Sequence, residues 1–222
     1  MILNEFDESW HDFLSKSGLL TKLETIVPNV ELLYEHLLVY PVRNQVFRAF
    51  KATKLTNLSV VLLGQDPFPG EYNGSPSACG LSFVTENGYI NPSLKIILKE
   101  LKRTDFNTTT PAQMTKWTKE GVLLLNSALT VERSKPGSHT KIWKSFTNNL
   151  LTSLSKHNPN IIYVLLGKDA QSFKENIISG HIIDLPHPMV DIYSGKNVFV
   201  GSNIFNTIND TLTKLKKPTI NF

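Results

Sequence analysis

Residues 59–70, SVVLLGQDPFPG, decide the fold, because five mostly apolar residues run straight into a turn. The apolar part, 59–63, shows no polar alternation, which is typical of a strand buried on both faces of a parallel sheet. The glycines, prolines and aspartate of 64–70 favour a turn and end the strand. Four more short apolar runs share this character: 81–84 (LSFV), 122–125 (VLLL), 161–166 (IIYVLL) and 181–185 (HIIDL). We predict that these runs are strands.

Helical periodicity fills the segments between the runs. Asn91 and Pro92 offer an N-cap and a first helical residue, and apolar side chains follow at helical spacing over 94–101. The same spacing recurs in three later segments, 143–154, 170–177 and 204–215. Alternating strands and helices predict an α/β fold, a three-layer α/β/α sandwich around a short central parallel sheet.

Two details of the helices and the domain organisation also follow from the pattern. Residues 21–40 hold a further helical pattern, which Pro28 interrupts or starts, and Ser202 is a plausible cap for the last helix. No linker-like stretch and no internal repeat divides the chain. We therefore expect one domain over residues 1–222.

Polar side chains follow four of the predicted strands. Each of these side chains stands within three residues of the end of an apolar run. They are Asp66, Asn126, Lys168 and His187. In open parallel sheets, ligands bind beyond the carboxyl ends of the strands. The sequence therefore predicts a site at one edge of the sheet, with these four side chains near it.

Composition narrows the class of protein. Hydrophobic residues make up 41% of the chain and charged residues 19%, which excludes a polar disordered protein. Cys79 is the single cysteine, so neither an internal disulfide nor a cysteine-rich metal site is expected. No apolar run approaches the roughly 20 residues of a membrane helix, and the acidic start does not resemble a signal peptide. We expect an intracellular, reducing compartment, and the net charge of +4 fits a polyanionic partner.

The stretch 60–70 closely resembles the water-activating motif of the family-one uracil-DNA glycosylases, which reads GQDPY followed by His or Pro. Further segments resemble that family in order and approximate spacing from about residue 7 to the C-terminus. They are the family's base-stacking segment, proline-rich loop, LLLN strand, Gly-Ser loop and HPSPL loop, matched here by 80–83, 91–94, 123–126, 166–170 and 187–188.

The chemistry of base removal fits two of the matched residues as catalytic groups. Hydrolysis of an N-glycosidic bond makes the sugar oxocarbenium-like and the leaving base anionic. The resemblance implies that Asp66 aims a water molecule and offsets the sugar's positive charge. It also implies that His187, as a neutral imidazole, donates a hydrogen bond to the base oxygen where negative charge gathers.

Four residues are implied to bind the base. An asparagine side chain can pair with the O4 acceptor and N3 donor of uracil, and Asn126 stands at the family's position for this role. Phe83 matches the aromatic residue that stacks on the flipped base, and Gln65 the residue whose backbone contacts it. Phe68 stands where the family usually has Tyr, and its ring is implied to fill the space that a thymine methyl group would need.

The resemblance also implies DNA contacts from loops, at Pro92, Ser93, Gly167, Lys168, Pro188, Met189, Val190, Ile192 and Tyr193. The last loop departs from the family, because Met189-Val190-Asp191 replaces Ser-Pro-Leu. Counting puts Asp191 where the family's leucine wedges into the base stack, and a carboxylate is a poor wedge beside phosphates. We expect a rebuilt loop in which Val190, Ile192 or Tyr193 takes that role. The linker 71–78 is also longer and more polar than usual.

These features predict a monofunctional uracil-DNA glycosylase of base-excision repair, which acts on single- and double-stranded DNA without a metal or another cofactor. Two alternatives stay open: a shifted preference for a modified uracil, suggested by Phe68, and a DNA-binding replication-accessory protein with weak catalysis, suggested by the altered loop. Besides DNA, a protein inhibitor that mimics DNA is a possible partner. We expect a monomer that does not bind membranes, located in the cytoplasm, or in a nucleus or viral replication complex.

Overall fold

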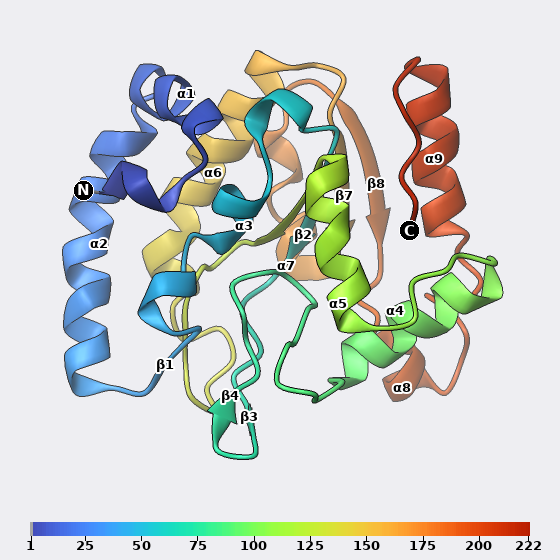
Figure 1. The fold of residues 1–222 in the computed structure, drawn as a ribbon, viewed down its shortest axis with the longest axis horizontal. Coiled ribbons are helices and arrows are strands. Elements are labelled where there is room, and N and C mark those ends of the chain that lie inside the picture. The colour runs from blue at the N-terminus through green and yellow to red at the C-terminus, as the bar shows by residue number, and fades with distance from the viewer. Residues whose placement is uncertain (1) are drawn as a thin grey trace.

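A four-stranded parallel sheet forms the centre of the structure, a computed structural model that describes residues 2–222 (Figure 1). Its strands lie in the order β5 (Val122–Asn126), β2 (Val60–Gly64), β7 (Ile162–Leu166) and β8 (His181–Leu185). All three neighbouring pairs are parallel. The prediction of a parallel sheet is confirmed, and β2, the strand of the opening stretch, lies between two others.

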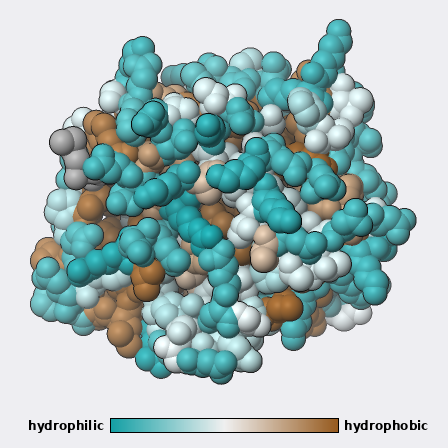
Figure 2. All heavy atoms as spheres, viewed as in Figure 1, coloured by the Kyte–Doolittle hydropathy of each residue, from teal (hydrophilic) through white to brown (hydrophobic). Residues whose placement is uncertain are grey.

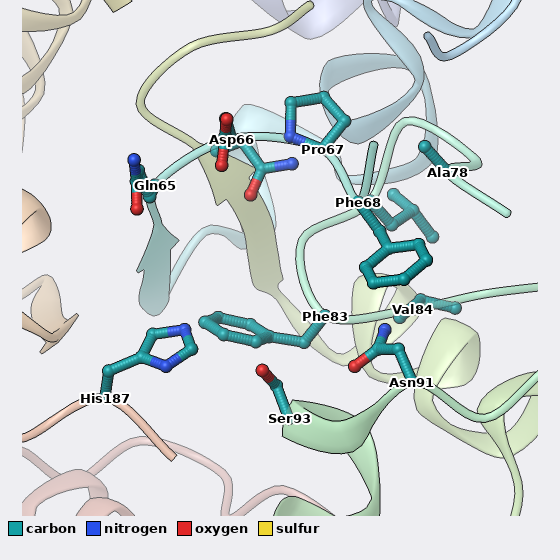
Figure 3. A pocket seen from close by; sticks show the side chains of 12 residues that line it. Gln65, Asp66, Pro67, Phe68, Ala78, Phe83, Val84, Asn91, Ser93 and His187 are labelled. Carbon is teal, nitrogen blue, oxygen red and sulfur yellow. The ribbon is translucent and has the colours of Figure 1, made fainter. Parts of the chain in front are cut away.

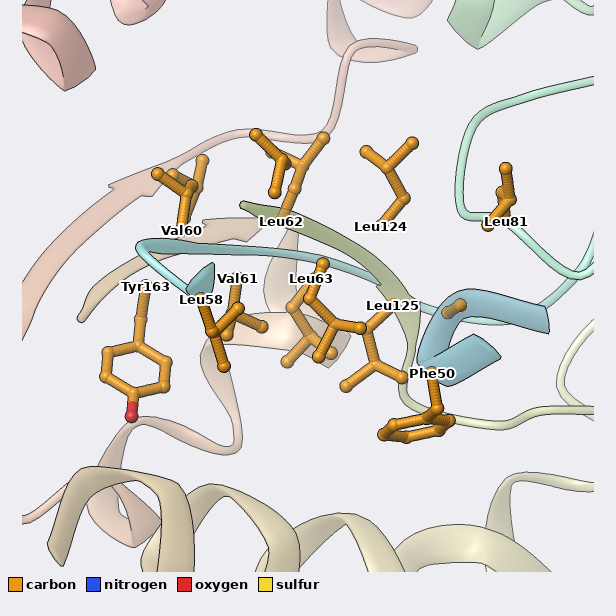
Figure 4. Close-up of a cluster of buried hydrophobic side chains, with 14 of the residues drawn as sticks. Phe50, Leu58, Val60, Val61, Leu62, Leu63, Leu81, Leu124, Leu125 and Tyr163 are labelled. Atoms are coloured by element: carbon orange, nitrogen blue, oxygen red, sulfur yellow. The ribbon is translucent and has the colours of Figure 1, made fainter. Parts of the chain in front are cut away.

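The sheet is buried on both faces, as the unbroken apolar runs predict. Figure 4 shows Val60 and Leu62 of β2 pointing to one face and Val61 and Leu63 to the other. Every residue of β2, β5 and β7 is buried. The run 181–185 differs, because β8 is an edge strand whose residues are exposed or half-buried. Its polar residues His181 and Asp184 are exposed.

Helices cover both faces and give the predicted three layers (Figure 1). On one side lie α1 (His11–Lys16), α2 (Leu19–His36), α3 (Arg48–Ala52) and α6 (Thr140–His157). On the other side lie α4 (Pro92–Arg103), α5 (Pro111–Met114) and α9 (Ile204–Lys214). Two short helices, α7 (Lys168–Gln171) and α8 (Val190–Ser194), follow the carboxyl ends of β7 and β8.

Aromatic side chains pack each helical layer together. On the first side, the ring centroids of Phe50 and Phe146 lie 6.2 Å apart, edge to face, which joins α3 to α6. On the second side, Phe222 near the end of the chain contacts both Trp117 and Phe205, at centroid distances of 5.0 and 4.9 Å. Such pairs add stability beyond the burial of their apolar area.

Helix predictions are confirmed in place and corrected in detail. Asn91 caps α4 by accepting a hydrogen bond from the backbone N–H of Leu94 at 2.9 Å, as predicted. Pro28 neither starts nor interrupts α2, which runs through it, because buried residues on both sides of Pro28 hold the helix against the core. The segment 170–177 is shorter than predicted: α7 is followed by a 3₁₀ turn at Lys174–Asn176.

The run 81–84 was wrongly predicted as a strand. It is a loop bonded to two strands of the sheet: the backbone N–H of Ser82 donates to the Leu124 carbonyl at 3.0 Å, and the Ser82 hydroxyl donates to the Leu62 carbonyl at 3.2 Å. Gly80 and Phe83 both have positive φ angles, 80° and 64°. These angles are incompatible with an extended strand, and a four-residue apolar run cannot distinguish a buried loop from a strand.

Two small antiparallel pairs complete the secondary structure. The strands β1 (Val39–Tyr40) and β6 (Val131–Glu132) pair, and β3 (Glu71–Tyr72) pairs with β4 (Ser75–Pro76). The second pair is a hairpin, built from the long linker, with Asn73 and Gly74 at its turn, both with positive φ. Asn-Gly is the preferred turn sequence of two-residue hairpins. The extra linker residues therefore form a defined structure.

The surface in this view is mainly hydrophilic, with an apolar patch at the lower left (Figure 2). The end of α2 and the segment after it lie there, and they carry the exposed side chains Leu32, Leu37, Leu38 and Val42. Within residues 2–222, none of the helices combines the length and apolar character that a membrane crossing requires.

A carboxylate of α4 accepts hydrogen bonds from backbone N–H groups just before α9. Glu100 of α4 is fully buried and accepts hydrogen bonds from the backbone N–H groups of Gly201 at 2.7 Å and Asn203 at 2.8 Å. Burial alone would raise the pKa of Glu100, but these bonds and the Arg103 guanidinium outweigh burial and lower that pKa. Ser202 is not the cap, and its buried hydroxyl has no partner within residues 2–222. That prediction was wrong because a residue about 100 positions away satisfies the neighbouring backbone groups.

We expect Glu100→Ala to lower the free energy of unfolding by about 3 kcal/mol, because Arg103 and two backbone N–H groups lose their buried acceptor. Urea unfolding of both proteins measures the difference. Glu35→Ala, at an exposed position of α2, is the control and should change stability by no more than about 0.5 kcal/mol. Similar effects of the two substitutions would contradict the proposed role of Glu100.

Candidate active site

A pocket of about 160 Å³ opens at the carboxyl edge of the sheet (Figure 3). A cavity of about 150 Å³ is known to hold a benzene-sized ring, so the pocket fits one planar ring. Loops after β2, β5 and β8 meet there with the loop 80–84 and the start of α4. The lining residues are Gln65, Asp66, Pro67, Phe68, Ala78, Leu81, Phe83, Val84, Asn91, Ser93, Asn126 and His187.

Asp66 lies in the turn after β2 and is held by one backbone group. Its Oδ2 accepts a hydrogen bond from the N–H of Gly137 at 2.6 Å, in a loop 71 residues away. Burial raises the pKa of Asp66, the Gly137 hydrogen bond opposes that rise, and the Asp169 carboxylate adds to it. A half-buried carboxylate with a raised pKa is a better proton acceptor than an exposed aspartate.

His187 lies in the turn after β8, and a local hydrogen bond orients its ring. The backbone N–H of Met189 donates to Nδ1 at 3.2 Å, so in the neutral ring the proton is on Nε2. Burial lowers the pKa of His187, while Asp169 opposes this effect. The imidazole is therefore neutral near pH 7 and has one N–H to donate. The backbone can pass this close because residue 167 is glycine: a Cβ there would lie 2.9 Å from the Cβ of His187.

Asn126 and Phe83 come together because residue 64 has no side chain. A Cβ on Gly64 would lie 2.9 Å from Oδ1 of Asn126 and 3.2 Å from the Phe83 ring. Asn126 ends β5 directly beside Gly64 in the parallel register. Phe83 has a φ of 64°, a left-handed conformation that is rare for an aromatic residue. Strain of this kind is concentrated at functional sites, and here it turns the ring over the sheet edge toward His187, with ring centroids 6.0 Å apart.

Gln65 and Phe68 complete the pocket wall from the turn after β2. The Gln65 carbonyl accepts from the Ser127 hydroxyl at 2.7 Å and the Ala128 N–H at 2.9 Å, which ties the turn after β2 to the segment after β5. Phe68 lies at the opposite end of the pocket from His187 (Figure 3). All six residues predicted to be catalytic or base-binding line this one pocket.

A second cavity of about 500 Å³ adjoins the first and shares Gln65 and His187 with it. Five residues predicted to bind DNA line it, namely Gly167, Lys168, Met189, Val190 and Tyr193. Of the other four, Ser93 lines the first pocket, Pro92 begins α4, Pro188 is buried, and Ile192 is exposed on α8. The geometry tests none of the assigned DNA contacts, and they stay predictions.

Asp191 faces the interior. Its carboxylate accepts hydrogen bonds from the backbone N–H groups of Val198 at 2.8 Å, Phe199 at 2.7 Å and Val200 at 2.9 Å. Burial would raise the pKa of Asp191, but these three bonds outweigh burial and lower that pKa. The segment that follows Met189 forms α8, which leaves 51% of Ile192 and 81% of Tyr193 exposed.

The sequence reasoning missed several residues that shape the site. Gly137 was not singled out, although its N–H holds Asp66, because the contact joins segments with no shared motif. Asn91 was assigned as a helix cap and as part of the loop 91–94 but not as a base-binding residue, yet it also lines the pocket. The ring of Tyr89 contacts the Phe68 ring. The sequence did not indicate this contact, since Tyr89 lies in a loop between two matched segments. Among residues 2–222, no group of His, Cys, Asp and Glu side chains is arranged to hold a metal ion.

The fold is that of an α/β protein, and its pocket, lined by the Asp66 carboxyl group and the His187 imidazole, has room for one planar ring. A model of the uracil DNA glycosylase superfamily matches residues 50–203. The uracil-DNA glycosylase of Borrelia duttonii is 37% identical over 226 residues, which covers 98% of each chain. That of Mycoplasmopsis pulmonis is 35% identical and covers 97% of each chain.

Solved structures agree in fold. Mimivirus uracil-DNA glycosylase has a TM-score of 0.88 at 24% identity, covering 100% of this chain and 88% of the mimivirus chain. A mimivirus UNG variant in complex with UGI has a TM-score of 0.87 at 25% identity, covering 97% of this chain and 88% of the other. The chain belongs to the uracil-DNA glycosylase superfamily.

Removing the charge of Asp66 and removing that of Asp191 should change the stability of the protein in opposite directions. A folded-state pKa above the unfolded value means that stability is lost as pH rises through it, which is the case for Asp66. Asp66→Asn removes the half-buried charge, and its side-chain oxygen can still accept from Gly137. We expect its melting temperature at neutral pH to equal or exceed that of the wild type.

Asp191→Asn is the matched comparison. Its folded-state pKa is lowered, so its carboxylate stabilises the fold above the unfolded pKa and this stability is lost as pH falls. We expect this variant to lose about 1–3 kcal/mol at neutral pH and less in acid. Thermal unfolding of the three proteins across pH gives the comparison. A lower melting temperature for Asp66→Asn than for Asp191→Asn would show that Asp66 is mainly structural.

Proposed function

We propose that this chain excises uracil from DNA by hydrolysing the N-glycosidic bond of deoxyuridine, in single- and double-stranded DNA. The products are free uracil and an abasic site, which places the reaction at the start of base-excision repair. One observation carries the proposal: a ring-sized pocket in which Asp66, Asn126 and His187, from three different strand ends, face the same space. The fold and the family membership of the chain support it.

The proposed recognition of the base starts at Asn126. Its amide offers a donor to O4 and an acceptor to N3–H, a pattern that fits uracil and not cytosine. The base reaches the pocket only after it leaves the DNA stack, which costs a few kcal/mol. Phe83, with its φ of 64°, places its ring in the pocket wall. Stacking of the base on this ring offsets part of the free energy that base flipping requires.

The proposed hydrolysis uses Asp66 and His187 at separate points of the substrate. Asp66, acting as the carboxylate, orients the attacking water and offsets the positive charge that develops on the sugar. As the C–N bond breaks, negative charge gathers on the uracil O2. His187, neutral because it is buried and with its Nε2–H free to donate, stabilises this charge.

The proposed path of the DNA runs over the second cavity. Gly167 and Lys168 begin α7 at this cavity, where the Lys168 ammonium group can meet a phosphate. Tyr193 borders the same cavity and is 81% exposed, and Asp191, at the family's wedge position, faces the core. Tyr193 is therefore our candidate, ahead of Val190 and Ile192, for the side chain that enters the stack when the base leaves.

Other partners follow only by analogy. One solved relative is described in complex with UGI, and we propose that a protein inhibitor which mimics DNA binds the same face of this chain. The monomeric state and the cytoplasmic location stay predictions from the sequence.

Single-turnover assays test the function. Labelled single-stranded and duplex oligonucleotides, each with one U, T, C or 5-substituted uracil, are incubated with excess protein, and abasic sites are cleaved with alkali. We expect release at U, with Asp66→Asn at least about 100-fold slower because the general base is lost, and with DNA affinity retained. DNA binding without release would favour the accessory-protein alternative. Faster release of a 5-substituted uracil would favour the altered base preference.

We expect Asn126→Asp to lower kcat/KM for uracil by about 100-fold or more, since the donor to O4 is lost and a buried carboxylate faces an acceptor. Cytosine, whose exocyclic amino group can donate to the new carboxylate, should become a detectable substrate. The same oligonucleotides carry the measurement. Asn149→Asp, at an exposed position of α6, is the matched control, and wild-type selectivity in Asn126→Asp would remove Asn126 from base recognition.

A further inference from the structure

A row of three aromatic rings runs outward from the pocket. The Phe68 ring, in the pocket wall, lies 5.5 Å from the Tyr89 ring, centroid to centroid and tilted by 36°. The Tyr89 ring is stacked on the Tyr72 ring at 5.6 Å and 27°. Tyr72 belongs to the hairpin β3–β4 and is 42% exposed. The row therefore links the pocket wall to the long linker that sets this chain apart from the usual family pattern.

Packing alone positions the Phe68 ring, because phenylalanine has no hydroxyl group that could anchor it. On one side the ring lies against the backbone of Gly70, where a Cβ would come within 2.5 Å of Cε1 of Phe68. The Phe68 ring also meets the ring of Tyr89, which is not part of the pocket lining. Without the Tyr89 ring, the Phe68 ring would lose this neighbour and have room to move away from the pocket.

Both supporting tyrosines are themselves held in place. The backbone N–H of Tyr89 donates to Oδ1 of Asn87 at 3.3 Å, and the Asn87 amide donates to the Ser75 carbonyl and the Ser77 hydroxyl, each at 3.0 Å. The loop that carries Tyr89 is thereby bonded to the hairpin that carries Tyr72.

The base of the hairpin is fixed to the rest of the protein. Glu71, next to Tyr72, forms an ion pair with Arg133 at 3.1 Å and accepts a hydrogen bond from the Tyr40 hydroxyl. The N–H of Ser77 donates to the Gly70 carbonyl at 3.1 Å, which closes the hairpin directly beside the Phe68 ring. Hairpin, loop and pocket wall thus form one connected unit.

We propose that Tyr89, backed by Tyr72, is a positioning residue that determines base specificity by holding the Phe68 ring against the space beside C5 of the bound base. The proposal rests on the proposed function, in which the pocket receives uracil. Its consequence is that rejection of thymine depends on residues outside the pocket. The row of rings thus connects two departures from the family pattern, because the long linker supplies Tyr72, which packs against Tyr89, and Tyr89 packs against Phe68.

The test compares Tyr89→Ala, Tyr89→Phe and Tyr72→Ala with the wild type by the ratio of kcat/KM for U over T in otherwise identical oligonucleotides. Both substrates are measured on one preparation, so a loss of folded protein cancels in the ratio. We expect Tyr89→Ala to lower the ratio about tenfold and Tyr72→Ala by a smaller factor. One extra methyl group in a well-packed pocket changes kcat/KM by about 10–200-fold, and part of this discrimination is lost when the pocket wall loosens. Tyr89→Phe keeps the ring and should keep the wild-type ratio.

A double-mutant cycle makes the test specific to the Phe68 contact. Phe68→Ala should lower the ratio more than Tyr89→Ala, and the double variant should match Phe68→Ala alone, because Tyr89 acts only through that ring. Tyr34→Ala, at a half-buried tyrosine on α2, is the matched control and should keep the wild-type ratio. Additive effects, or an unchanged ratio in Tyr89→Ala, would overturn the proposal.

Equilibrium binding of the free bases separates this proposal from the proposed function. The affinities for uracil and thymine are measured by isothermal titration calorimetry for the wild type and for Tyr89→Ala, which requires no turnover. A smaller preference for uracil in Tyr89→Ala would support the positioning role even if the wild type released no base. An unchanged preference would overturn the role even if the wild type were an active glycosylase.

Discussion

Parallel alignment of β5, β2, β7 and β8 is the constraint on which the rest of the molecule depends. A parallel sheet needs helical cover on both faces, and it brings all its carboxyl ends to one edge. Asp66, Asn126 and His187 follow three different strands and still face one pocket for this reason. Gly64 and Gly167 then allow the close approach that side chains at those two positions would prevent.

Glu100, Asp191 and Asp66 all accept hydrogen bonds from backbone N–H groups, and the balance between burial and these bonds differs among them. Glu100 and Asp191 each receive at least two such bonds, and their pKa values are lowered. Asp66 receives one, from Gly137, and its pKa is raised. The first two stabilise loops, whereas the third is left with unused capacity to accept a proton or orient water. The balance between burial and hydrogen bonding, to which the Arg103 guanidinium also contributes at Glu100, thus separates the two structural carboxylates from Asp66.

Much of this was predictable from local sequence. Unbroken apolar runs identified β2, β5 and β7, because burial on both faces leaves no place for polar alternation, whereas the edge strand β8 was identified from a shorter apolar stretch with polar residues in it. The motif resemblance placed six residues that do line one pocket. The failures have a common cause. The loop 81–84, the continuous helix through Pro28 and the cap of α9 all depend on contacts with distant segments, which local patterns do not contain.

Sequence by itself determined the fold class, the edge of the sheet that carries the pocket, and the identity of six side chains that line it, since each follows from periodicity or from a short contiguous motif. Only the tertiary structure decided how those side chains are held. The Gly137 bond to Asp66, the inward turn of Asp191 and the ring row from Phe68 to Tyr72 join segments that are close in space. Their geometry depends on the packing of the whole chain, because a hydrogen bond or ring contact exists only once the folded core has set the distance between its partners.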